Sequence, residues 1–286
     1  MKKNILVRGA TGFIGNYVIK QLLINNEFGI IATSRNKEHA LKQDWFNNVK
    51  YVEYDLNDKK DNLFDYFNKP DLLIHLAWEG LPNYDSEIHI EKNLINHYTF
   101  IKSLINDGLK EINCIGTCFE YGLQNGCLSE DLSTIPNTTY GLAKDSLRKF
   151  LEDLNKKKIF EYKWIRLFYM YGKGQASNSL LSLVEQSIKN NDAQFNMSQG
   201  EQLRDYLPIE DIAKYIIMIS LQNKINGIIN CASGKPISIR SLVESYLKEK
   251  KSHIELNLGY YDYAKYEPIA FWANIKKLNT IKNNEC

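Results

Sequence analysis

The sequence predicts an α/β fold, in which a doubly wound parallel sheet is followed by a smaller C-terminal α/β lobe. Short apolar runs alternate with longer segments of helical period, which is the pattern of repeated βαβ units. A glycine-rich turn, Gly9–Gly15, directly follows the first apolar run, and the alternation loosens after Tyr171. We therefore expect a first domain over residues 1–170 and a second over residues 171–286, with at least one segment of the second returning to the main sheet.

Six apolar runs are the expected strands of the main sheet. They are Asn4–Arg8, Gly29–Ser34, Val49–Tyr54, Leu72–Leu76, Glu111–Ile115 and Tyr162–Leu167. Segments of helical period lie between them at Gly12–Asn25, Asp61–Phe67, Ile88–Asn106 and Thr139–Leu154. In the second part, helices are expected at Ser179–Lys189, Ile209–Leu221 and Ser238–Glu249, with a strand at Ile228–Cys231.

The composition fits a globular protein and excludes several other classes. Of the 286 residues, 44% are hydrophobic and 24% are charged, which excludes disordered, collagen-like and coiled-coil chains. The 36 Lys and Arg residues nearly balance the 34 Asp and Glu residues, giving a net charge of +2. Because there is no basic cluster, RNA binding is supported only by the 12% aromatic share, and those residues are spread along the chain.

The cysteines and the apolar segments indicate a cytoplasmic protein. The five cysteines are odd in number, include no Cys-x-x-Cys pair and are expected to be reduced. No apolar run approaches the roughly 18 residues of a membrane helix, so we expect neither secretion nor a membrane span. The histidines share no metal-ligand spacing, so no metal is expected, and His75, within an apolar run, is expected to be a core residue.

The turn after the first strand has the spacing of a dinucleotide site. Its sequence is Gly9-Ala10-Thr11-Gly12-Phe13-Ile14-Gly15. The first glycine permits the tight turn, the second lets a pyrophosphate approach the backbone, and the third lets helix and strand pack closely. The N–H groups and the dipole at the helix start would hold the phosphates. The alternative interpretation is a tight strand-to-helix turn without a ligand.

The end of the second strand bears on the choice of cofactor. A site for NAD usually places an acidic residue there to bind the ribose 2′-hydroxyl, whereas a site for NADP places a cation to meet the 2′-phosphate. Ser34 and Arg35 stand at this place, with Arg8 expected nearby, so NADP(H) is favoured over NAD(H). The alternative for Arg35 is a solvated loop cation. Asp55 and Leu56, after the third strand, are placed to flank an adenine ring.

Tyr140 and Lys144 are the candidate acid–base pair. Their spacing puts a phenol and an ammonium one helical turn apart on the same face. A tyrosine has an ordinary pKa near ~10, and a cation one turn away lowers that value by stabilising the phenolate. Thr117, at the end of the fifth strand, could hydrogen-bond the carbonyl oxygen that receives the proton. The spacing is common, and the alternative is a pair of surface side chains.

With these motifs, the chain resembles an extended short-chain dehydrogenase/reductase of the NAD(P)-dependent epimerase/dehydratase family, which has a Rossmann fold and acts on nucleotide sugars. Matching segments run in order along nearly the whole chain: Gly9–Gly15, Asp55-Leu56, His75–Ala77, Asn93, Gly116–Gly122, Tyr140 with Lys144, Arg166–Gly172, Arg204–Tyr206 and Gly227–Gly234. The resemblance implies a nucleotide-sugar pocket in the second lobe. It also implies a homodimer formed through a four-helix contact of Ile88–Asn106 and Thr139–Leu154.

The resemblance implies a role for individual residues. Tyr140 would be the acid–base, Lys144 would lower its pKa and hold the nicotinamide ribose, and Thr117 would position the substrate oxygen. Further cofactor contacts would come from Leu76, Ala77, Asn93 and Phe168. Further substrate contacts would come from Trp78, Tyr169, Asn178 and Arg204, of which the arginine would meet the nucleotide diphosphate.

Two of these positions depart from the family pattern. Tyr169 stands where many relatives have an asparagine that touches the substrate phosphate. Trp78 is the first residue of a loop, Trp78–Pro82, whose counterpart in relatives has less distinctive residues. Its side chain is expected either to line the sugar pocket or to cap the core beside the cofactor.

Other departures narrow the reaction. Relatives that eliminate water across C5 and C6 of a hexose carry an Asp-Glu pair after the catalytic threonine, where this chain has Cys118 and Phe119. Relatives that epimerise at C3 and C5 use a cysteine at the position of Phe119 and a later histidine, which the matching stretch 177–180 lacks. Simple 4-epimerases keep NAD bound, and this fits poorly with Ser34 and Arg35.

The interpretation that remains by resemblance is reduction, by NADPH, of the C4 keto group of a nucleotide-linked 4-keto-6-deoxyhexose. The nucleotide would be dTDP and the product dTDP-fucose or dTDP-6-deoxytalose, destined for a surface polysaccharide. Two alternatives stay open: a 4-epimerase with tightly bound NAD, and a non-catalytic NADP-sensing regulatory protein that keeps the fold. The presence of Thr117, Tyr140 and Lys144 together argues against the regulatory protein.

Overall fold

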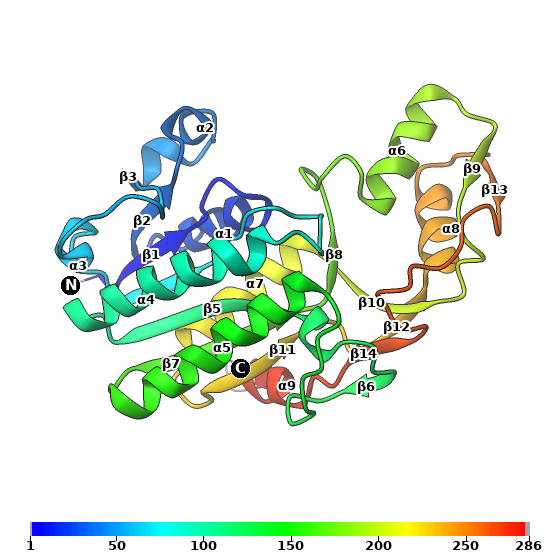
Figure 1. Ribbon diagram of the computed structural model, residues 1–286. Helices are drawn as coiled ribbons and strands as arrows, with labels where there is room; N and C mark the ends of the chain where they lie inside the picture. The colour runs from blue at the N-terminus through cyan, green and yellow to red at the C-terminus, as the bar shows by residue number, and fades with distance from the viewer. Residues whose placement is uncertain (1, 284–286) are drawn as a thin grey trace.

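A computed structural model describes residues 2–283 and confirms the α/β fold with a parallel main sheet (Figure 1). Seven strands form this sheet in the order β11-β7-β5-β4-β1-β2-β3, and all neighbouring pairs are parallel. The strands are β1 (Asn4–Arg8), β2 (Gly29–Ser34), β3 (Lys50–Glu53), β4 (Leu72–His75), β5 (Glu111–Thr117), β7 (Glu161–Leu167) and β11 (Gly227–Cys231).

The strand order places a crevice beside β1. The chain proceeds from β1 to β2 and β3 on one side, and then from β4 to β5 and β7 on the other. In open α/β sheets, ligands bind outside the carboxyl ends of the strands where the order reverses in this way. The residues that follow β1, β2, β4 and β5 are therefore expected to meet at one site.

Helices cover both faces of the sheet (Figure 1). Those described are α1 (Phe13–Leu23), α2 (Lys37–Leu41), α3 (Leu63–Tyr66), α4 (Ile95–Asp107), α5 (Thr139–Lys157), α6 (Leu180–Asn190), α7 (Ile209–Leu221), α8 (Ile239–Glu249) and α9 (Lys276–Asn283). The expected helix over Ile88–Asn106 has two parts, because α4 is preceded by a π-helical segment, His89–Leu94. Such segments are frequent at functional sites, and this one places Asn93 on the cavity described below.

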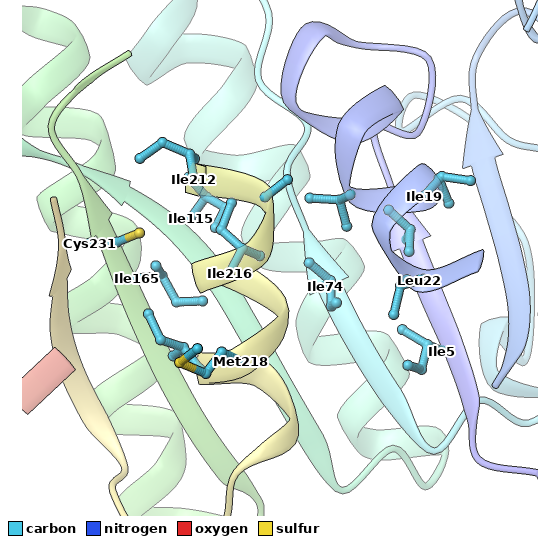
Figure 2. Packing of buried hydrophobic residues seen from close by; sticks show 14 of the residues in the cluster. Ile5, Ile19, Leu22, Ile74, Ile115, Ile165, Ile212, Ile216, Met218 and Cys231 are labelled. Carbon is cyan, nitrogen blue, oxygen red and sulfur yellow. The ribbon is translucent and has the colours of Figure 1, made fainter. Parts of the chain in front are cut away.

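Alternate residues of the central strands enter two separate cores. Ile5 and Val7 of β1 belong to the core under α1, α7 and α9, whereas Leu6 belongs to the core under α3, α4 and α5. Figure 2 shows Ile212 and Ile216 of α7 in the first of these two cores, the one that contains Ile5 and Val7. A strand buried on both faces has apolar residues in succession, and this is why short continuous apolar runs mark the sheet in the sequence.

A smaller lobe lies beside the main sheet (Figure 1). It contains α6, α8 and a two-stranded sheet of β9 (Gln194–Asn196) and β13 (Glu255–Asn257), around a core of Val184, Phe195, Met197, Val243 and Leu247. Further small sheets consist of β8 (Tyr169–Tyr171), β10 (Leu203–Pro208) and β12 (Pro236–Ser238), and of β6 (Gly126–Leu128) and β14 (Phe271–Ala273). The division of the chain at residue 170 stays a prediction, with α7 and β11 packed in the main body.

The part of the chain from residue 2 to residue 283 shows three further features. Its cysteines, Cys114, Cys118, Cys127 and Cys231, are free, and Cys286 lies outside the described residues. Over the same residues, no helix combines the length and the apolar character needed to cross a membrane. Nor do these residues bring together three or more His, Cys, Asp or Glu side chains in an arrangement that could hold a metal ion.

Candidate active site

A cavity of about 620 Å³ opens at the carboxyl ends of the central strands. It brings together nineteen of the residues predicted to contact cofactor or substrate: Gly9, Thr11, Gly12, Phe13, Ile14, Gly15, Ser34, Arg35, Asp55, Leu56, Leu76, Ala77, Trp78, Asn93, Thr117, Tyr140, Lys144, Phe168 and Tyr169. Asn178 and Arg204 do not line it. The cavity therefore joins the glycine-rich turn to the candidate acid–base pair.

The glycine-rich turn leaves the first turn of α1 open to this cavity. Gly9 has φ +90°, and a Cβ there would lie 2.8 Å from the backbone nitrogen of Ala77. A Cβ on Gly15 would lie 2.1 Å from the carbonyl oxygen of Gly9, so the helix can meet the strand this closely only at a glycine. Gly12 is the N-cap and provides no side-chain hydrogen bond to the helix. The turn thus forms a backbone cradle that fits the phosphates of a dinucleotide.

Arg8, the last residue of β1, has the properties of an anion-binding residue beside this cradle. Its side chain lines the cavity, and its buried Nε has no hydrogen-bond partner among residues 2–283. Burial lowers the pKa of Arg8 to about 10, and the nearby Asp55 carboxylate opposes that effect. Because a buried guanidinium nitrogen without a partner is costly, this side chain is suited to an anionic ligand.

A buried carboxylate holds Thr117 at the end of β5. The backbone N–H of Thr117 donates to Glu120 Oε1 at 2.8 Å, and its hydroxyl accepts from the N–H of Phe119 at 3.3 Å. Glu120 is fully buried and also accepts from Trp164 Nε1 at 2.9 Å and from Arg166 at 2.8 and 2.9 Å. This network anchors the candidate catalytic hydroxyl to the sheet.

Tyr140 lies in the first turn of α5, surrounded by other rings. Its backbone N–H donates to the carbonyl of Tyr84 at 2.8 Å. The Tyr140 ring lies 5.4 Å from that of His89, 5.8 Å from Tyr84, 6.0 Å from Trp78 and 6.1 Å from Phe119, between centroids. The pKa of Tyr140 is raised, and not lowered as expected from the neighbouring cation, because burial of the phenol outweighs the opposing hydrogen bond with Thr117. The phenol is therefore held protonated, as a proton donor must be.

Lys144 lies one turn further along α5 and is 3% exposed. Its ammonium lies 4.4 Å from the centroid of the Trp78 indole, within the range of a cation–π interaction. His97 stacks on the same indole at 4.7 Å and hydrogen-bonds to His75 at 2.7 Å. Trp78 thus both lines the cavity and packs beside the core. Burial lowers the pKa of Lys144 to about 8, while the Glu120 carboxylate opposes this.

This lowered pKa predicts that Lys144 costs stability at neutral pH. The unfolded chain, with an ordinary lysine pKa of 10.5, binds more protons than the folded chain between about pH 8 and pH 10.5. The folded protein should therefore gain stability as pH rises through this window. Replacing Lys144 by methionine should raise the free energy of unfolding by up to about 3 kcal/mol at pH 7, and the gain should vanish near pH 10.5.

Denaturant unfolding of the wild type and the Lys144→Met variant at several pH values measures this effect. The matched control is Lys156→Met, which changes an exposed lysine in the last turn of the same helix and should show no such pH-dependent gain. A stability difference for Lys144→Met that is the same at pH 7 and pH 10 would contradict the prediction.

Arg204 and Asn178 do not line the cavity, although the Arg204 guanidinium lies 5.9 Å from the centroid of the Tyr169 ring, which does. Two nitrogens of the Arg204 guanidinium, Nε and Nη2, donate to Glu267, at 3.3 and 2.8 Å, and the third donates to the carbonyls of Leu203 and Ile269. The Tyr169 hydroxyl donates to the other oxygen of Glu267. Asn178 is exposed. The roles of Arg204 and Asn178 toward a substrate stay predictions. In the structure, Glu267 already accepts hydrogen bonds from the Arg204 guanidinium.

Several residues at the cavity were not expected from the sequence. Tyr84 stacks on Phe119 at 4.6 Å, both line the cavity, and Tyr266 stacks on Phe119 at 6.2 Å. Glu79 and His97 also line the cavity. They come from loops and from one helix far apart in the chain, with no shared spacing. Because these residues share no local motif, the sequence alone does not indicate that they meet at one site.

The chain was compared with known proteins. Residues 5–232 match the model of the NAD dependent epimerase/dehydratase family. The dTDP-6-deoxy-L-talose 4-dehydrogenase (NAD(+)) of Aggregatibacter actinomycetemcomitans is 29% identical over 94% of this chain and 99% of its own length. The dTDP-4-dehydro-6-deoxyglucose reductase of Escherichia coli is 26% identical over 91% of this chain and 85% of its own length.

Among solved structures, the fold is similar to that of the UDP-N-acetylglucosamine 4-epimerase of Methanobrevibacter ruminantium M1. The two share 25% sequence identity at a TM-score of 0.86, over 98% of this chain and 92% of the other. The family match covers most of the chain, including the glycine-rich turn and the residues Thr117, Tyr140 and Lys144. The chain therefore belongs to the NAD dependent epimerase/dehydratase family.

Proposed function

We propose that the protein reduces the C4 keto group of a dTDP-linked 4-keto-6-deoxyhexose with NADPH, giving the corresponding dTDP-6-deoxyhexose. The observation that carries this proposal is the single cavity that joins the phosphate cradle of Gly9–Gly15 to the side chains of Thr117, Tyr140 and Lys144. A redox cofactor and a proton donor can act on one carbonyl only if they meet in this way.

The chain's own residues supply the proton and orient the carbonyl. Reduced nicotinamide, when bound, supplies the hydride that adds to the C4 carbon. Tyr140 gives its phenolic proton to the C4 oxygen, so hydride and proton together convert the ketone to an alcohol. Thr117 donates a hydrogen bond to that oxygen as negative charge develops on it. Lys144, as a cation, stabilises the tyrosinate that remains.

Two relatives support the choice of sugar. One is named for a dTDP-6-deoxy-L-talose and the other for a dTDP-4-dehydro-6-deoxyglucose, and both matches extend over nine-tenths or more of this chain. Both names describe redox chemistry on a dTDP-linked 6-deoxyhexose. NADPH is proposed because Arg8 and Arg35 provide cations beside the cavity, and Ser34 stands where a carboxylate would repel a 2′-phosphate.

The direct test uses the purified protein with NADPH or NADH and a panel of nucleotide-linked 4-keto-6-deoxyhexoses. Loss of reduced-cofactor absorbance should occur with dTDP-linked members, faster with NADPH, and the sugar product should carry a new C4 hydroxyl. The reverse reaction should appear with dTDP-6-deoxyhexose and NADP⁺. Absence of turnover with every member of the panel, by a protein shown to bind cofactor, would exclude the reductase.

A 4-epimerase is the second candidate, because the overall fold matches that of a UDP-N-acetylglucosamine 4-epimerase. Such an enzyme oxidises and re-reduces the same C4 carbon, so it would interconvert two sugars with no net change in cofactor. Cofactor that stays bound through purification, with epimer formation in the absence of added nicotinamide, would favour this candidate over the reductase.

We also propose a homodimer formed through α4 and α5. Four large apolar side chains are exposed on this part of the molecule: Ile90, Ile95, Leu142 and Phe150. Where exposed apolar side chains gather in one patch, they mark an interface between protein chains. Light scattering of the purified protein should give about twice the mass of one chain, and a monomer would contradict the proposal.

A further inference from the structure

Glu79 connects two strand ends across the cofactor cradle. It lies in the loop after β4, and its Oε1 accepts from Arg35 Nη1 at 2.8 Å. Arg35 follows β2, and β1 lies between β4 and β2 in the sheet. Both side chains line the cavity together with the glycine-rich turn that follows β1. The ion pair therefore spans the part of the cavity where the adenosine end of a dinucleotide would bind.

Glu79 is held in place from several directions. Its other oxygen accepts from Lys92 Nζ at 3.1 Å, and its backbone carbonyl accepts from Asn93 Nδ2 at 2.9 Å. The hydrogen bond from Arg35 and that from Lys92 lower the pKa of Glu79, so the carboxylate is charged at neutral pH. Its position is therefore fixed by two residues of the π-helical segment as well as by Arg35.

The geometry points to Glu79 as a residue that determines cofactor specificity, by competing with a 2′-phosphate for Arg35 and so moderating the preference for NADP(H) over NAD(H). This inference rests on the proposed use of a nicotinamide cofactor. It concerns a residue after β4, whereas the sequence pattern places the selecting residues only at the end of β2.

The physical reason is a difference in charge between the two cofactors. A 2′-phosphate beside Arg35 would lie close to the Glu79 carboxylate, and two negative groups near a protein surface repel each other appreciably. Arg35 would also have to share its donors between the carboxylate and the phosphate. A ribose 2′-hydroxyl carries no charge, so NAD(H) meets neither penalty. Removing the negative charge of Glu79 should therefore favour only the phosphorylated cofactor.

The test compares Glu79→Gln with the wild type by isothermal titration calorimetry, using NADP⁺ and NAD⁺. The dissociation constant for NADP⁺ should fall about tenfold, and that for NAD⁺ should stay within about twofold. The fragments 2′-phospho-ADP-ribose and ADP-ribose should show the same contrast, which would locate the effect at the adenosine end. The matched control is Glu91→Gln, which removes an exposed carboxylate from the neighbouring π-helical segment. This variant should leave the ratio of the dissociation constants for NADP⁺ and NAD⁺ unchanged.

A second variant makes the mechanism specific. Arg35→Ser should weaken NADP⁺ binding. In the Arg35→Ser background the Glu79→Gln change should have a smaller effect, because competition for Arg35 is gone and only the direct repulsion between carboxylate and phosphate is left to remove. If the ratio of the dissociation constants for NADP⁺ and NAD⁺ is unchanged in Glu79→Gln, or if the variant binds NADP⁺ more weakly, Glu79 does not have this role. The proposed function would be unaffected by that result, as long as the wild-type protein binds a nicotinamide cofactor. A wild-type protein that binds neither cofactor would overturn both.

Discussion

Replacing Tyr140 by phenylalanine should lower kcat by about 10² to 10⁴, the usual contribution of a positioned proton donor. The change removes one oxygen atom and keeps the ring, which packs among Trp78, Tyr84, His89 and Phe119. Cofactor binding, measured by calorimetry, should stay close to that of the wild type, since the phosphate cradle lies on β1 and α1. The loss should therefore appear in turnover and not in cofactor affinity.

The matched control for this prediction is Tyr84→Phe. Tyr84 also lines the cavity and lies 5.8 Å from Tyr140 between ring centroids, so the same atom is removed from a neighbouring ring. Its hydroxyl has no proposed part in proton transfer, and kcat should fall far less than in Tyr140→Phe. Equal losses in the two variants, or full turnover by Tyr140→Phe, would remove Tyr140 from the mechanism.

Replacing Glu120 by alanine should lower the free energy of unfolding by about 3–5 kcal/mol. Glu120 and Arg166 are both fully buried, and Glu120 accepts two hydrogen bonds from the guanidinium. Without the carboxylate, the buried Arg166 charge loses its anionic partner and keeps the Tyr121 ring, 4.3 Å away, while Trp164 Nε1 loses its acceptor. Chemical denaturation of the purified variant measures the loss.

A double variant identifies the cause of this loss. Glu120→Leu combined with Arg166→Met removes both charges, and it should recover a large part of the stability that Glu120→Ala loses. Glu244→Gln is the surface control, because the Arg240–Glu244 pair is about half exposed and should contribute little. If Glu120→Ala unfolds at the same denaturant concentration as the wild type, the buried pair has no such role.

We expect Glu120 to affect catalysis as well as stability, because its carboxylate opposes the lowering of the Lys144 pKa and so helps to keep that lysine charged. The Glu120 side chain also fixes the backbone N–H of Thr117 at 2.8 Å. In Glu120→Gln, which retains an acceptor oxygen and most of the volume, we expect a folded protein with reduced kcat. A purely structural role would leave the kcat of the folded fraction unchanged, so activity normalised to folded protein distinguishes the two.

The fold could be predicted from the sequence because its signals are local. β1 and β2 begin and end where the apolar runs do, and the glycine-rich turn follows β1 directly. β5 continues through Gly116 and Thr117, beyond the expected end at Ile115, since these residues still pair with β7. α2 was not expected, because this short helix after β2 has little apolar periodicity.

The parts of the site that could not be predicted depend on contacts between distant segments. Arg204 and Glu267 are paired in the structure, yet the sequence marks only the arginine. The partnership of Arg35 and Glu79 is likewise formed by the sheet order, which brings together the loops after β2 and β4. No spacing rule connects such residues, because their proximity is a product of folding.

The position of β11 in the sheet has a consequence for how the protein is made. β7 pairs with β5 on one side and with β11 on the other, and β11 is synthesised only after α6 and α7. Until residues 227–231 leave the ribosome, the nascent sheet ends at β7 with unpaired backbone groups, which is the kind of edge that promotes aggregation. A chain released at residue 170 would keep that edge and would also lack α7. Completion of the cofactor-binding half during translation therefore depends on sequence that lies well beyond it.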